Sequence, residues 1–200
     1  MKYVVGARGS QLSVAQTNWV ISELKKMNPN SNYEIKTITT KGDTDSRPLF
    51  TIDQKGIFEK EIDKAVAQKE VDFAVHSLKD VPSELDENLI LACIPKREVV
   101  NDVFISADGT SLTDIKSDAV IGTSSLRRAV QVSRMRPDVI VKPIRGNIET
   151  RIKKASGENY DAIVLAQAGI SRLVIDVKYT ALSISDFSPS PGQGAIAIVA

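Results

Sequence analysis

Cysteine, histidine and aromatic residues are all scarce in this sequence. Its 200 residues include one cysteine, Cys93, one histidine, His76, and 5% aromatic residues. A lone cysteine excludes an internal disulfide framework and is typical of a reducing compartment. His76 lies in an apolar strand pattern, which favours a hydrogen-bonded core histidine over a catalytic base. Because His and Cys residues do not cluster, we expect no metal site.

Neither sign of charge is in excess, and long apolar runs are missing. Lys and Arg number 26 and Asp and Glu number 25, whereas nucleic-acid-binding proteins usually carry a basic excess. No run approaches the ~20 apolar residues of a membrane helix, and residues 1–6 resemble a strand rather than a signal peptide. We therefore expect a soluble, cytoplasmic protein that binds neither nucleic acid nor membranes, and we take a monomer as its expected state.

Strand and helix patterns alternate along most of the chain. Strands are expected at 3–7, 33–39, 73–76, 90–94, 103–105, 120–122, 139–144, 162–165 and 195–199. This alternation predicts an α/β fold with mostly parallel sheets. Turn-rich segments at 95–98 and 183–191 are interpreted as two crossings between two lobes, 1–96 plus 188–200 and 97–187. Such a protein is expected to bind its ligand between the lobes, at the carboxyl ends of strands.

Shorter patterns predict one helix, one loop and one buried side chain. Residues 40–54 are rich in Gly, Asp, Lys and Thr and predict a long mobile loop. Cys93 lies in the apolar run 89–94 and is expected to be a buried, inert thiol. Ser10 is expected to cap a helix whose core face is formed by Leu12, Ala15, Trp19 and Leu24.

Four arginines lie on two strand-to-helix turns. The segments 122–128 and 145–151 each follow an apolar strand pattern and open a helical one. A helix amino terminus offers unpaired N–H groups and partial positive charge, and small hydroxyl residues and guanidinium groups add to its attraction for anions. The helix dipole disfavours cations at that position, which argues against plain surface charges. We expect a ligand that carries several carboxylates or phosphates.

Asp80 is the strongest candidate for chemistry. It follows the buried strand 73–76 and stands two residues before Pro82, which would fix the turn. A carboxylate that faces arginines is suited to stabilising a cation that forms during a reaction. The alternative interpretation of Lys79 and Asp80 is a solvated turn.

The segments 76–82 and 122–128 resemble the porphobilinogen deaminase, or hydroxymethylbilane synthase, family. Further matching segments occur in family order at 7–10, 41–43, 55–58, 97–98, 145–151, 160–162, 168–173 and 192–195. The resemblance implies a type II periplasmic-binding-protein-like fold. It also implies a transferase that condenses four porphobilinogen molecules head to tail into hydroxymethylbilane, with release of ammonia, in tetrapyrrole and heme biosynthesis. Members extend the pyrrole chain on a dipyrromethane cofactor.

The resemblance also assigns roles to residues of this chain. Asp80 is similar to the catalytic aspartate of the family. The carboxylates of substrate or cofactor are expected to be bound by residues on several of the matching segments. These are Arg8, Ser10, Lys55, Lys79, Thr123, Ser124, Ser125, Arg127, Arg128, Arg145, Gly146, Asn147, Arg151 and Gln193.

One departure from the family concerns the cofactor. Family members usually carry a third domain after the segment 192–195, and its cysteine holds the dipyrromethane. We expect no such domain in this chain and a non-covalent dipyrromethane, with Cys93 a poor anchor. The alternatives are a third domain supplied by a separate polypeptide and a truncated or degenerate relative. A further alternative is a non-catalytic two-lobed protein that binds a carboxylate-rich ligand.

Overall fold

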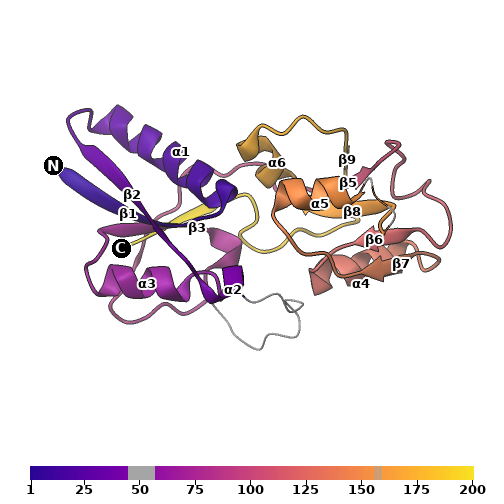
Figure 1. The fold of residues 1–200 in the computed structure, drawn as a ribbon, viewed down its shortest axis with the longest axis horizontal. Coiled ribbons are helices and arrows are strands. Elements are labelled where there is room, and N and C mark those ends of the chain that lie inside the picture. Colours follow the sequence, from indigo (N-terminus) through magenta and orange to yellow (C-terminus); the bar gives the residue numbers. More distant parts are fainter. Residues whose placement is uncertain (45–56, 156, 158) are drawn as a thin grey trace. The chain divides into compact units, whose positions relative to one another are not determined.

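The computed structural model describes residues 1–44, 57–155, 157 and 159–200, and these divide into two compact units (Figure 1). Unit 1 holds residues 1–44, 57–98 and 191–200 of the described chain, and unit 2 holds residues 99–190. The lobe borders expected from the sequence, at 96/97 and 187/188, stay a prediction. Lys55 and residues 45–54 of the predicted loop lie outside the described residues.

Unit 1 is built on one sheet with helices on both sides. Its described elements are β1 (Lys2–Arg8), α1 (Gln11–Met27), β2 (Asn32–Ile38), α2 (Lys41–Thr44), α3 (Lys60–Ala67), β3 (Phe73–Ser77), the 3₁₀ helix η2 (Leu78–Asp80), β4 (Leu91–Cys93) and β10 (Ile196–Val199). The strand order is β2-β1-β3-β10-β4. β1 is parallel to β2 and β3, and β10 is antiparallel to β3 and β4. The apolar run 195–199 therefore returns to this sheet, as predicted.

Alternating side chains of the sheet in unit 1 give it two apolar faces, because successive residues of a strand point to opposite sides. Val5 and Val75 pack in one cluster with Val20 of α1. Ala74 packs in another with Ile62 of α3. The two helices therefore cover opposite faces of the sheet (Figure 1).

Unit 2 repeats this plan. Its described elements are β5 (Asp102–Ser106), β6 (Val120–Gly122), α4 (Leu126–Met135), β7 (Ile140–Lys142), α5 (Ile148–Ala155), β8 (Ala162–Ala166), α6 (Gln167–Leu173) and β9 (Thr180–Ala181). The order is β7-β6-β8-β5-β9, with β6 parallel to β7 and β8 and β5 antiparallel to β8 and β9. In each described sheet, four of five strands thus point the same way, which confirms the prediction of mostly parallel sheets.

The core of unit 2 also lies on both faces of its sheet. Phe104 and Ile121 pack in one cluster with Val132 of α4. Ile163 packs in a second cluster with Ala155 of α5, and α6 contributes to the same cluster. Both helices that follow the arginine turns, α4 and α5, are therefore anchored by buried apolar residues.

The predicted cap of α1 is confirmed, and of its predicted core face Leu24 packs against the core whereas Trp19 does not. The Ser10 side chain accepts a hydrogen bond from the Ser13 N–H, 3.3 Å away. Trp19 is 36% exposed, whereas Gln16 and Thr17 are buried. Burial of these two polar side chains is tolerated because Gln16 Nε2 donates to Ser77 Oγ (2.9 Å) and Thr17 Oγ1 donates to the Ser13 carbonyl (2.9 Å).

Two further expectations need correction. Residues 41–44 form helix α2 rather than loop, because Asp43 Oδ2 accepts hydrogen bonds from Thr40 N (3.0 Å) and Thr40 Oγ1 (2.8 Å). Cys93 is exposed rather than buried. It lies on β4, which stands at the end of the strand order, and Leu91 of the same strand is exposed too. An apolar strand at a sheet edge has no neighbour on its outer side, which the sequence pattern alone does not reveal.

Candidate functional site

The carboxyl ends of parallel strands gather the predicted site residues into one set within each unit. In unit 1, β1 ends at Arg8, and the parallel strand β3 ends at Ser77, directly before the 3₁₀ helix η2 that holds Lys79 and Asp80. In unit 2, the neighbouring parallel strands β6 and β7 lead into the two arginine turns. Parallel strands end at the same edge of their sheet, so each set lies at one edge.

Arg8 of unit 1 is held at two points. Its Nη2 forms an ion pair with Asp43 Oδ1, and its guanidinium carbon lies 4.0 Å from the centre of the Phe58 ring. Gly42 leaves room for that ring, because a side chain at this position would overlap Phe58. In the described part of the chain, Arg8 Nε is buried and has no hydrogen-bond partner. The orientation of Arg8 is therefore fixed by the ion pair and the ring contact.

Asp80 is exposed, and a buried acid lies close to it. Glu59 directly precedes α3 and is 3% exposed. Burial, followed by the charges of Asp80 and Asp63, raises the pKa of Glu59 to about 8, against the lowering effects of a hydrogen bond to the Phe58 backbone and of Arg8. A protonated carboxyl thus stands near the candidate catalytic carboxylate. The sequence analysis missed Glu59, because an acid directly before a helix is also a common surface feature.

His76 is the hydrogen-bonded core histidine that the sequence predicted. It is buried in β3, and its Nε2 lies 2.9 Å from Asp63 Oδ1 of α3. The pair ties the helix that Glu59 precedes to the strand that leads to Asp80.

The segment 192–194 supports the turn of Asp80. Gly192 has φ +70°, and a Cβ there would lie 3.0 Å from the Lys79 backbone nitrogen, so only glycine fits against η2. Arg97 Nε donates to the Gln193 carbonyl (2.8 Å), and Glu98 N donates to the Gly194 carbonyl (3.0 Å). The Gln193 side chain is buried, and its role as a ligand-binding residue stays a prediction.

Hydroxyl groups shape the first arginine turn of unit 2. Ser125 caps α4, and its Oγ accepts from the Arg128 backbone N–H (3.4 Å). Thr123 Oγ1 accepts from Ser125 N (3.2 Å). Ser124 Oγ donates to the Ile144 carbonyl and accepts from Ile144 N (3.2 Å), which joins this turn to the start of the second. These hydroxyls hold the backbone of the turn, and their predicted contact with a ligand stays a prediction.

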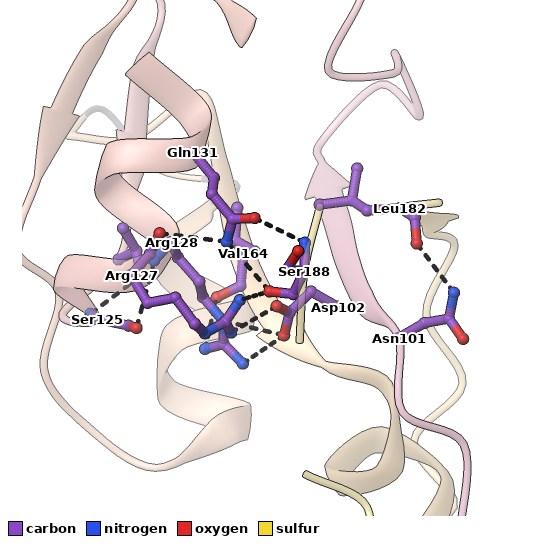
Figure 2. Close-up of polar contacts among 10 residues, drawn as sticks. Asn101, Asp102, Ser125, Arg127, Arg128, Gln131, Val164, Leu182 and Ser188 are labelled. Atoms are coloured by element: carbon purple, nitrogen blue, oxygen red, sulfur yellow. Dashed lines mark hydrogen bonds and ion pairs between the residues drawn. The ribbon is translucent and has the colours of Figure 1, made fainter. Parts of the chain in front are cut away.

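The two adjacent arginines converge on one buried acid (Figure 2). Asp102 Oδ1 accepts from Arg128 Nε (3.0 Å) and Nη2 (2.7 Å), and Asp102 Oδ2 accepts from Arg127 Nη2 (2.6 Å). Burial acts to raise the pKa of Asp102, but the two arginines outweigh it, so this pKa lies below its usual value. Arg128 is only 7% exposed, so it is the member of the pair whose guanidinium lies in the protein interior. Asp102 carries no sequence signal beyond an acid before an apolar strand.

The second arginine turn brings like charges together. Gly146 has φ +121°, and Asn147 Oδ1 accepts from Thr150 N (2.8 Å) at the start of α5. Arg151 Nε donates to the Gly146 carbonyl (2.7 Å). Burial, together with the positive charges of Arg128 and Arg145, lowers the pKa of Arg151 to about 10. At neutral pH all three side chains are still cationic, so this group suits a ligand with several negative charges.

Two classes of feature are not found in the described part of the chain. No helix there is long and apolar enough to cross a membrane. No group of three or more His, Cys, Asp or Glu residues there could hold a metal ion.

Residues 3–200 match the family model described as porphobilinogen deaminase, dipyromethane cofactor binding domain. The chain belongs to the porphobilinogen deaminase family. It is 86% identical over 200 residues to a probable porphobilinogen deaminase of Nitrosopumilus maritimus and covers 64% of that relative. It is 48% identical over 203 residues to a porphobilinogen deaminase of Listeria innocua and covers 65% of it, with 98% of this chain aligned. The chain thus spans about 65% of the length of these family members.

Solved structures confirm the predicted fold class. The substrate-binding domain of a putative molybdenum ABC transporter from Clostridium difficile matches with a TM-score of 0.59 at 14% identity, over 99% of this chain and 84% of that one. The effector-binding domain of BenM with benzoate matches with a TM-score of 0.56 at 11% identity, over 99% and 82%. At this level of identity the likeness shows the fold alone, which is of the type II periplasmic-binding-protein kind.

Glu59 should make stability depend on pH. Its pKa of about 8 lies above the ordinary 4.5, so between these values the native state holds a proton that the unfolded state lacks. Stability should therefore fall as pH rises from about 5 to about 8, by on the order of 3–5 kcal/mol. Urea unfolding of Glu59→Gln should lose this slope, whereas the exposed control Glu70→Gln should keep it. Equal slopes in wild type and Glu59→Gln would contradict a buried protonated acid.

The two arginines that bind Asp102 should differ in their effect on stability. Arg128→Met leaves a fully buried carboxylate short of its main partner and should cost about 3–5 kcal/mol. Arg127→Met removes a more exposed partner and should cost about 1–2 kcal/mol. Arg134→Met, at an exposed position of the same helix, should stay within about 0.5 kcal/mol of wild type. Urea denaturation measures all three, and equal losses for Arg127 and Arg128 would contradict the described division of contacts.

Proposed function

We propose that this chain carries the condensation of four porphobilinogen molecules into hydroxymethylbilane, with release of ammonia. Membership of the porphobilinogen deaminase family supports this proposal. The chain spans about 65% of the length of its relatives, so the activity of the whole protein is proposed for it. The observation that carries it is the placement of both arginine turns, with Arg127, Arg145 and Arg151, at the ends of two neighbouring parallel strands. A pyrrole chain with an acetate and a propionate on every ring presents the row of carboxylates that such a group would bind.

In this proposal the arginines bind and orient the substrate. Guanidinium groups pair with carboxylates through two parallel hydrogen bonds, which fixes direction as well as position. We assign the binding of the ligand carboxylates to Arg127, Arg145 and Arg151 of unit 2 and to Arg8 and Lys79 of unit 1. Lys55 and Ser10 keep the binding roles that the resemblance gave them as predictions. Orientation matters because each step joins the free ring carbon of one pyrrole to the methylene carbon of another.

Asp80 is assigned to the charge that forms when ammonia leaves. Loss of ammonia from porphobilinogen leaves a methylene pyrrole cation, and a carboxylate fixed beside the ring stabilises it. Asp80 is exposed at the end of η2, so its charge is hydrated before substrate arrives. We assign the neutral, protonated form to the neighbouring Glu59, because this avoids a second negative charge at this edge of the sheet.

The residues present fit a dipyrromethane cofactor. Its carboxylates would be held by Arg127, Arg145 and Arg151, because burial and the charges of Arg128 and Arg145 disfavour the cation of Arg151, and an anion offsets both effects. When bound, the cofactor supplies the pyrrole end on which the family extends its product. We propose that the contacts made by these 200 residues are non-covalent, and that Cys93 on β4 is not the anchor. The cytoplasmic location and the monomeric state stay predictions.

Asp80→Asn tests the chemistry. The variant should fold and bind porphobilinogen but lose about 3–4 kcal/mol of transition-state stabilisation, roughly a hundredfold to a thousandfold in turnover. The measurement is the rate of porphobilinogen consumption together with ammonia release. Asp86→Asn, which removes an exposed carboxylate of the same unit, is the matched control and should keep the wild-type rate. Wild type that binds porphobilinogen without consuming it would instead identify a non-catalytic binding protein.

Cys93→Ser tests how the cofactor is held. Because Cys93 is exposed, its thiol is accessible, and burial no longer argues against an anchor there. If the contacts are ionic, the dipyrromethane should be seen by native mass spectrometry in wild type and in Cys93→Ser, and should leave both on denaturation. High salt should speed its loss. A cofactor that stays attached to denatured wild type and is missing from Cys93→Ser would make Cys93 the anchor.

A further inference from the structure

Asp102 stands outside the set of residues assigned to substrate, yet it contacts two arginines of the first turn (Figure 2). We propose that Asp102 is the positioning residue of this turn. Asp102 binds the Arg128 guanidinium within the protein interior. It also holds Arg127 in the orientation in which the remaining N–H groups of Arg127 bind a ligand carboxylate. The choice of ligand rests on the proposed function, whereas the control of Arg127 by Asp102 does not.

The contacts of the two arginines are unequal. Arg128 gives two donors to Asp102 Oδ1 and a third to the Val164 carbonyl (3.4 Å), and its side chain is 9% exposed. Arg127 gives Asp102 Oδ2 a single donor, and its side chain is 25% exposed. A guanidinium group has five N–H donors. Arg127 is therefore the arginine of the pair that reaches solvent, while its Nη2 is fixed by the hydrogen bond to Asp102.

A second contact fixes the other side of Arg127. Its Nη1 donates to the Ser188 carbonyl. Ser188 is itself held by Gln131 of α4, whose Oε1 accepts from Ser188 N (2.6 Å) and whose Nε2 donates to the Ser188 carbonyl (3.1 Å). Arg127 is thus fixed between two acceptors that do not depend on a ligand. Such prior order lowers the entropy lost on binding.

The carboxylate of Asp102 is required because both of its oxygens accept. An amide of the same shape keeps one accepting oxygen and presents an NH₂ group in place of the other. Oδ1 receives two donors from Arg128 and Oδ2 one from Arg127. The amide should therefore orient its oxygen toward Arg128 and its NH₂ toward Arg127. Asp102→Asn should release Arg127 in preference to Arg128.

A double-mutant cycle on the full chain tests whether Asp102 acts through Arg127. Porphobilinogen is the probe, and its affinity is measured by calorimetry on folded protein. Asp102→Asn and Arg127→Gln should each weaken binding by about 10- to 100-fold, the scale of one charge-assisted hydrogen bond. The double variant should bind within about twofold of Arg127→Gln alone, because the two changes remove one interaction. Losses that multiply in the double variant would overturn the proposal.

The matched control is Asp161→Asn. Asp161 pairs with Lys116 (2.7 Å) and accepts from Val120 N (2.7 Å) in the same unit, so its removal reports the general cost of losing a paired carboxylate. It should leave porphobilinogen affinity unchanged. If Asp102→Asn does not fold, the cycle is run in the Arg128→Met background with Asp102→Leu, which removes the acceptor of Arg127 and leaves no buried charge unbalanced. The same non-additivity is expected there, and additive losses would again overturn the proposal.

A ligand-free measurement separates this proposal from the proposed function. In protein labelled with ¹⁵N-arginine, exchange of the guanidinium N–H protons should be slow for both arginines in wild type. In Asp102→Asn it should become faster for Arg127 than for Arg128. Unchanged exchange at Arg127 would overturn the positioning role whatever the ligand is. Fast exchange at Arg127 in this variant, with no binding of porphobilinogen to wild type, would support the positioning role and reject the proposed function.

Discussion

Gathering like charges at a buried edge is unfavourable, and the arginine turns of unit 2 depend on how that cost is offset. Parallel pairing of β6 and β7 places both turns at one edge, so Arg128, Arg145 and Arg151 repel one another. Asp102 offsets part of this charge from within the core, because a fully buried carboxylate with two guanidinium partners stays ionised. The charges of Arg128 and Arg145 still act on Arg151, whose pKa is lowered by burial and by these charges, and an anion beside Arg151 would offset them.

Unit 1 gathers acidic rather than basic side chains at one edge of its sheet. Asp80 and Glu59 are two carboxyls at one edge of a sheet, and their environments separate them: exposure keeps Asp80 hydrated, while burial holds the proton on Glu59. A pair of acids with different protonation states is a common device for chemistry near neutral pH. Arg8, fixed by Asp43 and Phe58, adds one positive charge to the same edge. In the proposed function, the Asp80 carboxylate of this arrangement is the group assigned to the cation that forms during reaction.

Periodicity and turn chemistry predicted the two sheets, the returning strand 195–199 and the cap at Ser10, because these depend on neighbours in sequence. The predictions that were wrong or missing share another cause, which is contact between residues far apart in the sequence. Gln16 is buried because Ser77, far along the chain, accepts its hydrogen bond, and Cys93 is exposed because β4 ends the strand order. Asp102 was missed because its partners follow it by 25 residues or more. Long-range pairing decides each of these positions, and a single sequence does not encode it locally.

The capping of the helices narrows the chemistry of the ligand. An uncapped helix amino terminus binds phosphate through its backbone N–H groups, and the sequence predicted such a role for both turns. In the structure Ser125 Oγ accepts from the Arg128 N–H, and Asn147 Oδ1 accepts from the Thr150 N–H. The helix starts thus satisfy part of their own donors, and anion binding in these turns falls mainly to guanidinium side chains. Guanidinium forks match the planar geometry of a carboxylate. The turns therefore favour a ligand with several separate carboxylates over one compact phosphate held at a single helix end.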